Sequence, residues 1–95
     1  MATLHIEHEI TDFATWKAAF DRFAERRKDA GVIAHRIHQP HNDATYVVLQ
    51  LDFPSIDQAQ AFCKFLESRV WSVPANSPGL AGSPSARVLI EAPEQ

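Results

Sequence analysis

The first pattern along the chain is a strict alternation of side-chain type over residues 3–9. Leu4, Ile6 and His8 fall on one face of an extended chain, and polar residues fall on the other. A period of two predicts a β-strand with one face turned toward a core. Asp12 follows, and a carboxylate in this place can accept hydrogen bonds from the free N–H groups that begin a helix.

After Asp12 the apolar spacing changes to three and four residues. The positions that share one face at this spacing are Phe13, Trp16, Phe20, Phe23 and Ala24. This stripe predicts an amphipathic helix. Arg27 continues the stripe by count, and we expect its charged end to reach water along the helix surface. Gly31 is typical of the residue that ends a helix, so we predict one helix from residue 13 up to Gly31.

Two more strands and a second helix follow. Residues 32–39 and 45–53 have strand patterns, and the turn-forming residues 40–43 separate them. Ser55 and Gln58 match a capping box, which predicts the start of a helix. The apolar stripe of that helix is Ile56, Ala59, Phe62, Cys63 and Leu66.

The end of the chain predicts a loop and a last strand. Residues 72–84 hold three prolines and two glycines, which favours a loop, and residues 86–92 form the last strand-like segment. The order βαββαβ is that of the ferredoxin-like α+β fold. Right-handed crossovers then give a four-stranded antiparallel sheet in the order 4-1-3-2, with two helices on one face.

The opposite face of this sheet is predicted to carry Tyr46 and Val48 without a covering layer. An open face with apolar content usually finds a partner, and a second copy of the chain is the simplest one. We therefore expect a homodimer in which two sheets face each other and form an α/β barrel.

Composition narrows the class of protein. The 95 residues are expected to form a single domain, residues 1–95. The net charge is −3 and the longest Lys/Arg run is at 26–28, which argues against nucleic acid. The chain has no apolar run of about 18 residues, so we expect no transmembrane helix. Met1-Ala2-Thr3 lacks the basic and apolar regions of a signal peptide, so we expect none. With Cys63 as the only cysteine, no intrachain disulfide is possible, and we expect a cytoplasmic protein.

The predicted topology brings several chemically active side chains to one edge of the sheet. These residues are His8, Asp12, Trp16, His38, His41, Tyr46, Trp71 and Arg87. The loop at 72–84 reaches the same edge and is suited to act as a lid. This edge is the candidate site.

His8 is the candidate catalytic residue, with Trp16 beside it. By parity His8 faces the helices, where it is either a buried histidine bonded to a backbone carbonyl or to Asp12, or a general base in a cleft. Trp16 is either a core residue or a wall of that cleft. If the site is functional, Tyr46 and Trp71 complete the substrate-binding wall.

Arg36 and His38 are expected on the open face. Arg36 either forms a salt bridge with Glu7 or an interface contact, or it binds an acidic ligand inside the dimer barrel, because the arginine fork suits carboxylates.

The five histidines raise the question of a metal site, and their spacing argues against one. His5 and His8 point to opposite faces of one strand, as do His35 and His38. No HExxH motif, cysteine pair or glycine-rich phosphate loop is present. We therefore predict no metal ligands and no cofactor.

Residues 8–17 follow the pattern H-x-[VI]-x-D-[FY]-x-x-W-K, and the chain continues with Phe20-Asp21, Arg27, Gly31, Arg36, TYVVLQLDF and a late AGSP. In these residues it resembles a small, largely uncharacterised group of the dimeric α/β-barrel superfamily. That superfamily includes cofactor-independent monooxygenases of antibiotic biosynthesis, which act on aromatic substrates in a cleft between sheet and helices. The resemblance implies a small-molecule site with monooxygenase-like chemistry; the alternative is a non-catalytic binding or structural homodimer.

Overall fold

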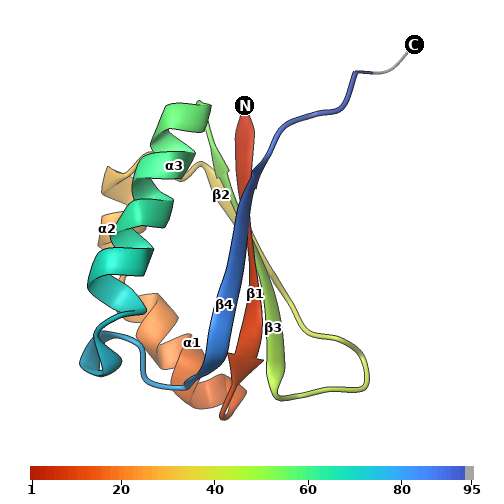
Figure 1. Cartoon of the computed structure of the whole chain (residues 1–95), viewed down its shortest axis with the longest axis vertical. Coiled ribbons are helices and arrows are strands. Elements are labelled where there is room, and N and C mark those ends of the chain that lie inside the picture. Colours follow the sequence, from red (N-terminus) through yellow and green to blue (C-terminus); the bar gives the residue numbers. More distant parts are fainter. Residues whose placement is uncertain (94–95) are drawn as a thin grey trace.

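The computed structural model describes residues 1–93 and has two layers, a four-stranded sheet and helices that cover one of its faces (Figure 1). The strands are β1 (Ala2–Ile10), β2 (Ala34–His38), β3 (Tyr46–Phe53) and β4 (Leu80–Leu89). The helices are α1 (Phe13–Arg22), α2 (Ala24–Asp29) and α3 (Ile56–Phe65), and α3 continues into a π-helical turn at Leu66–Val70. Within residues 1–93, no helix is long and apolar enough to cross a membrane.

The order of strands in the sheet is β2-β3-β1-β4, and every neighbouring pair is antiparallel. This is the predicted order read from the opposite edge, so the ferredoxin-like α+β fold is confirmed. After α2 the chain returns as β2, one strand away from β1, and β3 then fills the place between them; after α3 the chain returns as β4 on the other side of β1. The two central strands, β1 and β3, carry the core.

The face of the sheet under the helices holds the core of the molecule. Its fully buried side chains are Leu4, Ile6, Val47, Leu51 and Phe53. Side chains on β1 and β3 alternate between buried and partly exposed positions along each strand, as the period of two predicted. His8 belongs to the buried set, with 4% of its surface exposed.

The single helix predicted between residue 13 and Gly31 is two helices. The backbone leaves helical geometry at Phe23 (φ −98°, ψ 14°), where α1 ends and α2 begins. The Phe23 ring packs edge-on against Phe65 of α3 at 6.3 Å between centroids. Apolar spacing continues through the break, so the pattern alone cannot reveal it. The predicted ends hold: Asp12 accepts from the Thr15 N–H at 2.8 Å, and Gly31 follows α2 at φ +95°.

The predicted loop at 72–84 and strand at 86–92 need correction. The strand β4 begins earlier, at Leu80, where it pairs with Ile10, and it ends at Leu89. Backbone pairing requires no apolar alternation, so Ala81 to Pro84 lie in the strand despite a loop-like composition. An irregularity in the pairing with β1, between Glu7 and Glu9, accommodates this stretch.

Candidate functional site

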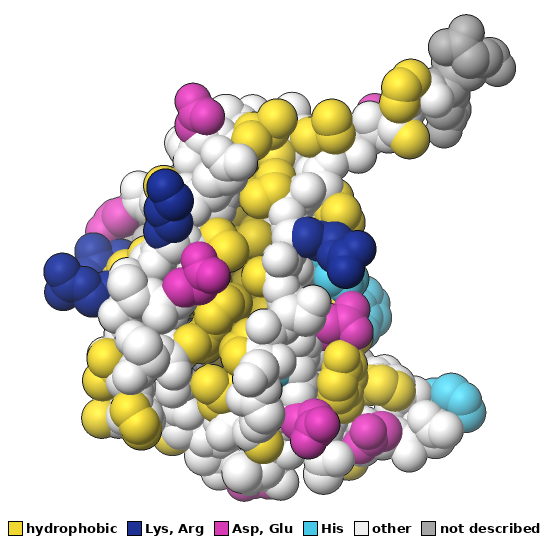
Figure 2. Space-filling view, in the orientation of Figure 1, with side chains coloured by type: hydrophobic (Ala, Val, Ile, Leu, Met, Phe, Trp, Pro, Cys, Tyr) yellow, Lys and Arg dark blue, Asp and Glu magenta, His cyan; other side chains and the backbone are white. Residues whose placement is uncertain are grey.

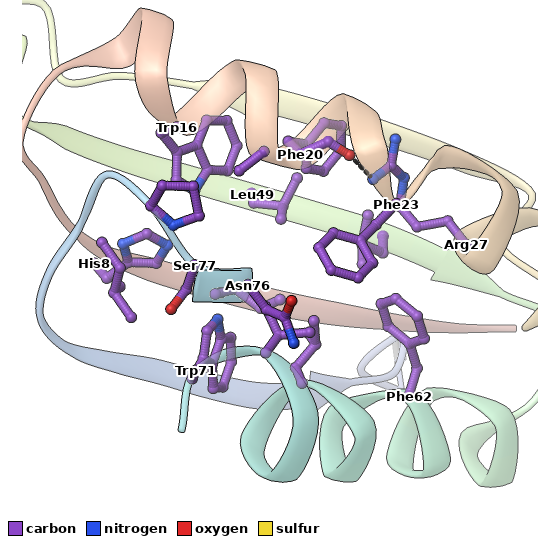
Figure 3. A pocket seen from close by; sticks show the side chains of 17 residues that line it. His8, Trp16, Phe20, Phe23, Arg27, Leu49, Phe62, Trp71, Asn76 and Ser77 are labelled. Carbon is purple, nitrogen blue, oxygen red and sulfur yellow. Dashed lines mark hydrogen bonds between the residues drawn. The ribbon is translucent and has the colours of Figure 1, made fainter. Parts of the chain in front are cut away.

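A pocket of about 70 Å³ lies between the helices and the sheet. Its aromatic wall consists of Trp16, Phe20, Phe23, Phe62 and Trp71. Both tryptophans of the chain belong to this wall. In the space-filling view, a band of hydrophobic side chains follows the boundary between the helix layer and β4 (Figure 2). In the close-up, His8 lies at one end of the pocket and Arg27 at the other (Figure 3).

The cavity is small next to the roughly 300–1,000 Å³ of pockets that enclose drug-sized ligands. In this conformation it suits at most a small guest, and a larger one requires the wall to move outward. Residues 76–78 form part of the pocket wall. They begin at Asn76, the last residue of a short 3-10 turn at Pro74–Asn76. This segment is the part of the predicted 72–84 lid that reaches the pocket.

His8 is held in one orientation by its backbone and by Trp16. Its Nδ1 lies 2.8 Å from the carbonyl oxygen of Glu9, and its ring meets Trp16 edge-on at 6.2 Å between centroids. Of the two structural partners expected from the sequence, the backbone carbonyl is the one used. Within residues 1–93, no protein group forms a hydrogen bond with the other ring nitrogen, Nε2.

These contacts define the protonation state of His8. A carbonyl oxygen only accepts, so Nδ1 carries the hydrogen and donates it to Glu9. Burial lowers the pKa of His8 from its ordinary value of 6.5, an effect that the bond to Glu9 opposes. The imidazole is therefore neutral near pH 7, and the lone pair of a neutral ring with Nδ1–H is on Nε2. The residue offers the pocket a hydrogen-bond and proton acceptor.

The aromatic rings of α1 form a continuous stack along the pocket. Trp16 stacks on Phe20 at 5.2 Å between centroids with an interplanar angle of 23°. Phe13 packs on the other side of Trp16 at 5.8 Å. The helical spacing that predicted a core stripe thus also builds one wall of the pocket, so both expected roles of Trp16 are combined.

Gly79 holds the chain directly after residues 76–78 close to the backbone of Trp16. Its φ is +87°, and a Cβ added there would lie 2.9 Å from the backbone nitrogen of Trp16. The Gly79 carbonyl accepts from the Thr11 N–H at 2.8 Å. Only glycine tolerates both the left-handed backbone and this close approach.

Arg27 is the charged residue among the pocket residues that the site prediction missed. It was expected to extend to water, yet only 8% of its surface is exposed. Its guanidinium stacks over the Phe20 ring at 3.6 Å, and Nη1 donates to the Phe20 carbonyl at 2.5 Å. That carbonyl lies in the last turn of α1, so Arg27 caps the helix end. The sequence did contain a sign of this burial, since Arg27 continues the apolar stripe of the helix.

Arg36 and Tyr46 lie on the opposite face of the sheet, away from the pocket. Arg36 donates two hydrogen bonds to Asp52, at 2.8 and 2.9 Å. The Tyr46 hydroxyl donates to Glu7 at 2.7 Å, and Glu7 also bonds His5 at 2.8 Å. The bond to Glu7 raises the pKa of Tyr46. The partner of Arg36 is thus Asp52 and not the expected Glu7.

Of the eight residues predicted at one edge, three line the pocket: His8, Trp16 and Trp71. For these three residues, the position at one edge of the sheet correctly predicted that they lie together. Other residues at this edge point to the opposite face of the sheet, because side chains alternate along each strand. His38 pairs with Val48 and Arg87 pairs with His5, so both belong to the open face.

Within residues 1–93, no group of three or more metal-ligating side chains lies close enough to hold an ion. The polar groups that the pocket offers are His8 Nε2, which accepts hydrogen bonds, the Arg27 guanidinium, which donates them, and the polar ends of Asn76 and Ser77. Such a set suits an organic molecule with one or two polar groups.

Three solved structures share this fold over nearly their whole length. An antibiotic biosynthesis monooxygenase has a TM-score of 0.68 at 12% identity, covering 98% of this chain and 100% of that one. A monooxygenase from the gene ActVA-Orf6 of Streptomyces coelicolor, in complex with nanaomycin D, has a TM-score of 0.64 at 18% identity, covering 99% and 89%. A dimeric ferredoxin-like protein from an uncultured marine organism has a TM-score of 0.60 at 11% identity, covering 100% and 98%.

These similarities show that the chain has the ferredoxin-like fold. No protein-family model matches the sequence, and a search of curated proteins finds no match either. At such low identities the likeness establishes the fold alone, so the function is argued from the pocket.

Proposed function

We propose that this protein binds a small aromatic molecule in the pocket between sheet and helices, and that His8 accepts a proton from it. The observation that carries the proposal is His8 itself, a buried neutral imidazole whose Nε2 has no protein partner within residues 1–93 and which borders an aromatic cavity. Aromatic walls favour flat guests through stacking and edge contacts. A neutral imidazole is the form that takes up a proton near neutral pH.

The reaction we propose is cofactor-independent and monooxygenase-like. Transfer of a phenolic proton to His8 would leave an electron-rich phenolate, which dioxygen oxidises more readily than the phenol. One oxygen atom of dioxygen would enter the ring and the other would leave as water, so that a phenol and dioxygen give a quinone and water, and the ring supplies all four electrons. The apolar wall would keep water from this anion. Two proteins of similar fold are monooxygenases, and one of them was crystallised with nanaomycin D.

Binding is tested by titrating the protein with phenol while recording its tryptophan fluorescence. Both tryptophans line the pocket, so the signal reports directly on its occupancy. Catalysis is tested by oxygen uptake with phenol as the substrate, above the rate without protein. We expect His8→Phe to abolish the uptake, while His41→Phe, in the exposed turn after β2, leaves it unchanged.

The alternative is a binding or structural homodimer without catalysis. The hydrogen bond from His8 to Glu9 and the small cavity favour it. Phenol binding without any oxygen uptake would support this alternative. Failure of phenol and other single-ring compounds to change the tryptophan signal would reject the ligand site altogether.

We also propose that the protein forms a homodimer through the open face of its sheet. This face is the side of the four-stranded sheet that no helix of residues 1–93 covers (Figure 1). Tyr46, Val48 and Leu89 give it apolar surface beside the bonded polar groups. A protein of similar fold is described as dimeric. A sedimentation mass equal to the 10.6 kDa chain at micromolar concentration would reject the dimer.

A further inference from the structure

Arg27 is the one charged side chain among the residues that line the pocket. It enters from α2 and lies at the opposite end from His8 (Figure 3). A charge in such a place is unusual, because arginine is almost never fully buried unless it is paired. The contacts of its guanidinium therefore show what the pocket still lacks.

The protein satisfies only part of the guanidinium. Nη1 donates to the Phe20 carbonyl, and the flat group stacks on the Phe20 ring. A guanidinium has five N–H donors, and within residues 1–93 no protein group accepts from Nε or Nη2. Those two nitrogens form the edge that binds a carboxylate through two parallel hydrogen bonds.

No carboxylate of the described residues pairs with Arg27. The salt bridges within residues 1–93 involve His5, Lys17 and Arg36, and each lies elsewhere. Burial lowers the pKa of Arg27, and the more distant charge of Asp21 offsets this only in part. No fully buried side-chain nitrogen of the described residues lacks a partner, so Nε and Nη2 of Arg27 keep some contact with solvent. An anion in the pocket would replace this water and gain the attraction of a cation in a largely apolar surrounding, in addition to its contact with the aromatic wall.

We propose that the pocket selects an aromatic carboxylate, with the carboxylate bound to the Nε–Nη2 edge of Arg27 and the ring against Trp16 and Phe20. The proposal rests on the proposed function, since it names the class of ligand for the same pocket. The stack from Trp16 through Phe20 to Arg27 places a flat apolar wall beside a cation. An aromatic ring that carries a carboxylate can contact the aromatic side chains and the cation at the same time.

The test compares benzoate with benzamide, which has nearly the same shape and no charge. Tryptophan fluorescence measures both affinities in the wild-type protein. We expect benzoate to bind about tenfold more tightly, because hydrogen bonds between two charged groups are stronger than those to a neutral amide. The net charge of −3 opposes any anion, so a preference for benzoate cannot come from the overall charge of the chain.

Arg27→Met should remove the preference and leave benzamide binding in place. Arg26→Met is the matched control, because Arg26 is the adjacent arginine, lies over Phe65 at 4.6 Å and does not line the pocket. Arg27→Lys keeps the charge without the fork and should retain part of the preference. If Arg27→Met fails to fold, Arg27→Lys still tests the proposal, because this variant should bind benzoate more weakly than the wild-type protein does.

The possible results separate the two proposals. If both compounds bind equally to the wild type, the pocket is a ligand site and the assignment of an acidic ligand is wrong. If benzoate is preferred but Arg27→Met and Arg27→Lys keep the full preference, Arg27 is not its partner and the assignment is also wrong. If neither benzoate, benzamide nor phenol binds, the ligand site itself is rejected together with this inference.

Discussion

At the scale of single residues, His8 links the pocket to the stability of the fold. Its pKa is lower in the folded protein than the ordinary value of 6.5. Below pH 6.5 the unfolded chain therefore binds more protons at this position than the folded one, and protonation favours unfolding. Stability should be fully present above pH 6.5 and should fall as the pH decreases from 6.5 toward the lower folded value.

The variant His8→Asn isolates this contribution. An asparagine amide can donate near the position of Nδ1 but does not titrate. We expect the unfolding free energy of the variant, from urea denaturation, to fall less than that of the wild type when the pH is lowered about one unit below 6.5. The other four histidines are common to both proteins. Equal pH dependence in the two would contradict a lowered pKa at His8.

Gly79 is a second residue at which the neighbouring structure restricts substitution. Gly79→Ala should destabilise the protein by about 1–3 kcal/mol, because the new Cβ meets the Trp16 backbone and the backbone has positive φ. Gly82→Ala is the control: its φ is +67°, but its nearest neighbour, in Glu9, would lie 3.8 Å away. Urea denaturation should show a smaller loss for Gly82→Ala, and equal losses would mean that the contact with Trp16 costs nothing.

At the scale of elements, the capping of α3 supports one side of the pocket. The Ser55 hydroxyl accepts from the Gln58 N–H at 3.3 Å, and Phe62 on this helix lines the pocket. Ser55→Ala should lower the unfolding free energy by about 1 kcal/mol, while Ser55→Asp should keep the wild-type value or exceed it. Thermal or urea denaturation measures both. Identical stability in the alanine variant would show that the cap is not used.

The break between α1 and α2 has a consequence for the pocket that a continuous helix would not have. Ending α1 at Arg22 frees carbonyls in its last turn, and Arg27 reaches back to the one of Phe20. The same contact draws the guanidinium over the Phe20 ring and into the wall. The kink thus turns a residue expected at the surface into a buried cation beside the ligand space.

At the scale of the whole molecule, the open face of the sheet is the surface through which we propose that the dimer forms. The predicted apolar content is present but limited, because Tyr46, Glu7 and His5 form one bonded chain, and Arg36 and Asp52 form another pair beside it. Their side chains satisfy one another, so the face can be covered without leaving polar groups unpaired.

Val48→Asp tests this interface. Val48 lies on the open face opposite Glu7 in the sheet, so a new carboxylate there would be buried beside an existing one in a dimer. We expect sedimentation to show a dimer for the wild type and a monomer for Val48→Asp. Ala61→Asp places the same charge on an exposed position of α3 and should remain dimeric. A dimer in both variants would place the interface elsewhere.

The sequence by itself determined the order of the strands, the topology of the sheet and the face to which the side chains of β1, β2 and β3 point. These follow from periodicity and local caps, which depend on neighbours a few residues apart: Asp12, Ser55 and Gly31 mark the helix ends where expected. Parity likewise assigned His8 to the helix side of the sheet.

Tertiary structure alone decided the rest. The early start of β4 depends on its pairing with β1. The break at Phe23 depends on packing against α3. Neither contact changes the spacing of apolar residues along the chain, so neither can be predicted from it. The pocket needs chain segments far apart in sequence, so only the fold could separate Trp71 from Tyr46 and bring Arg27 to the end opposite His8. Its burial without a carboxylate partner among the described residues is a property of packing, which no residue pattern encodes.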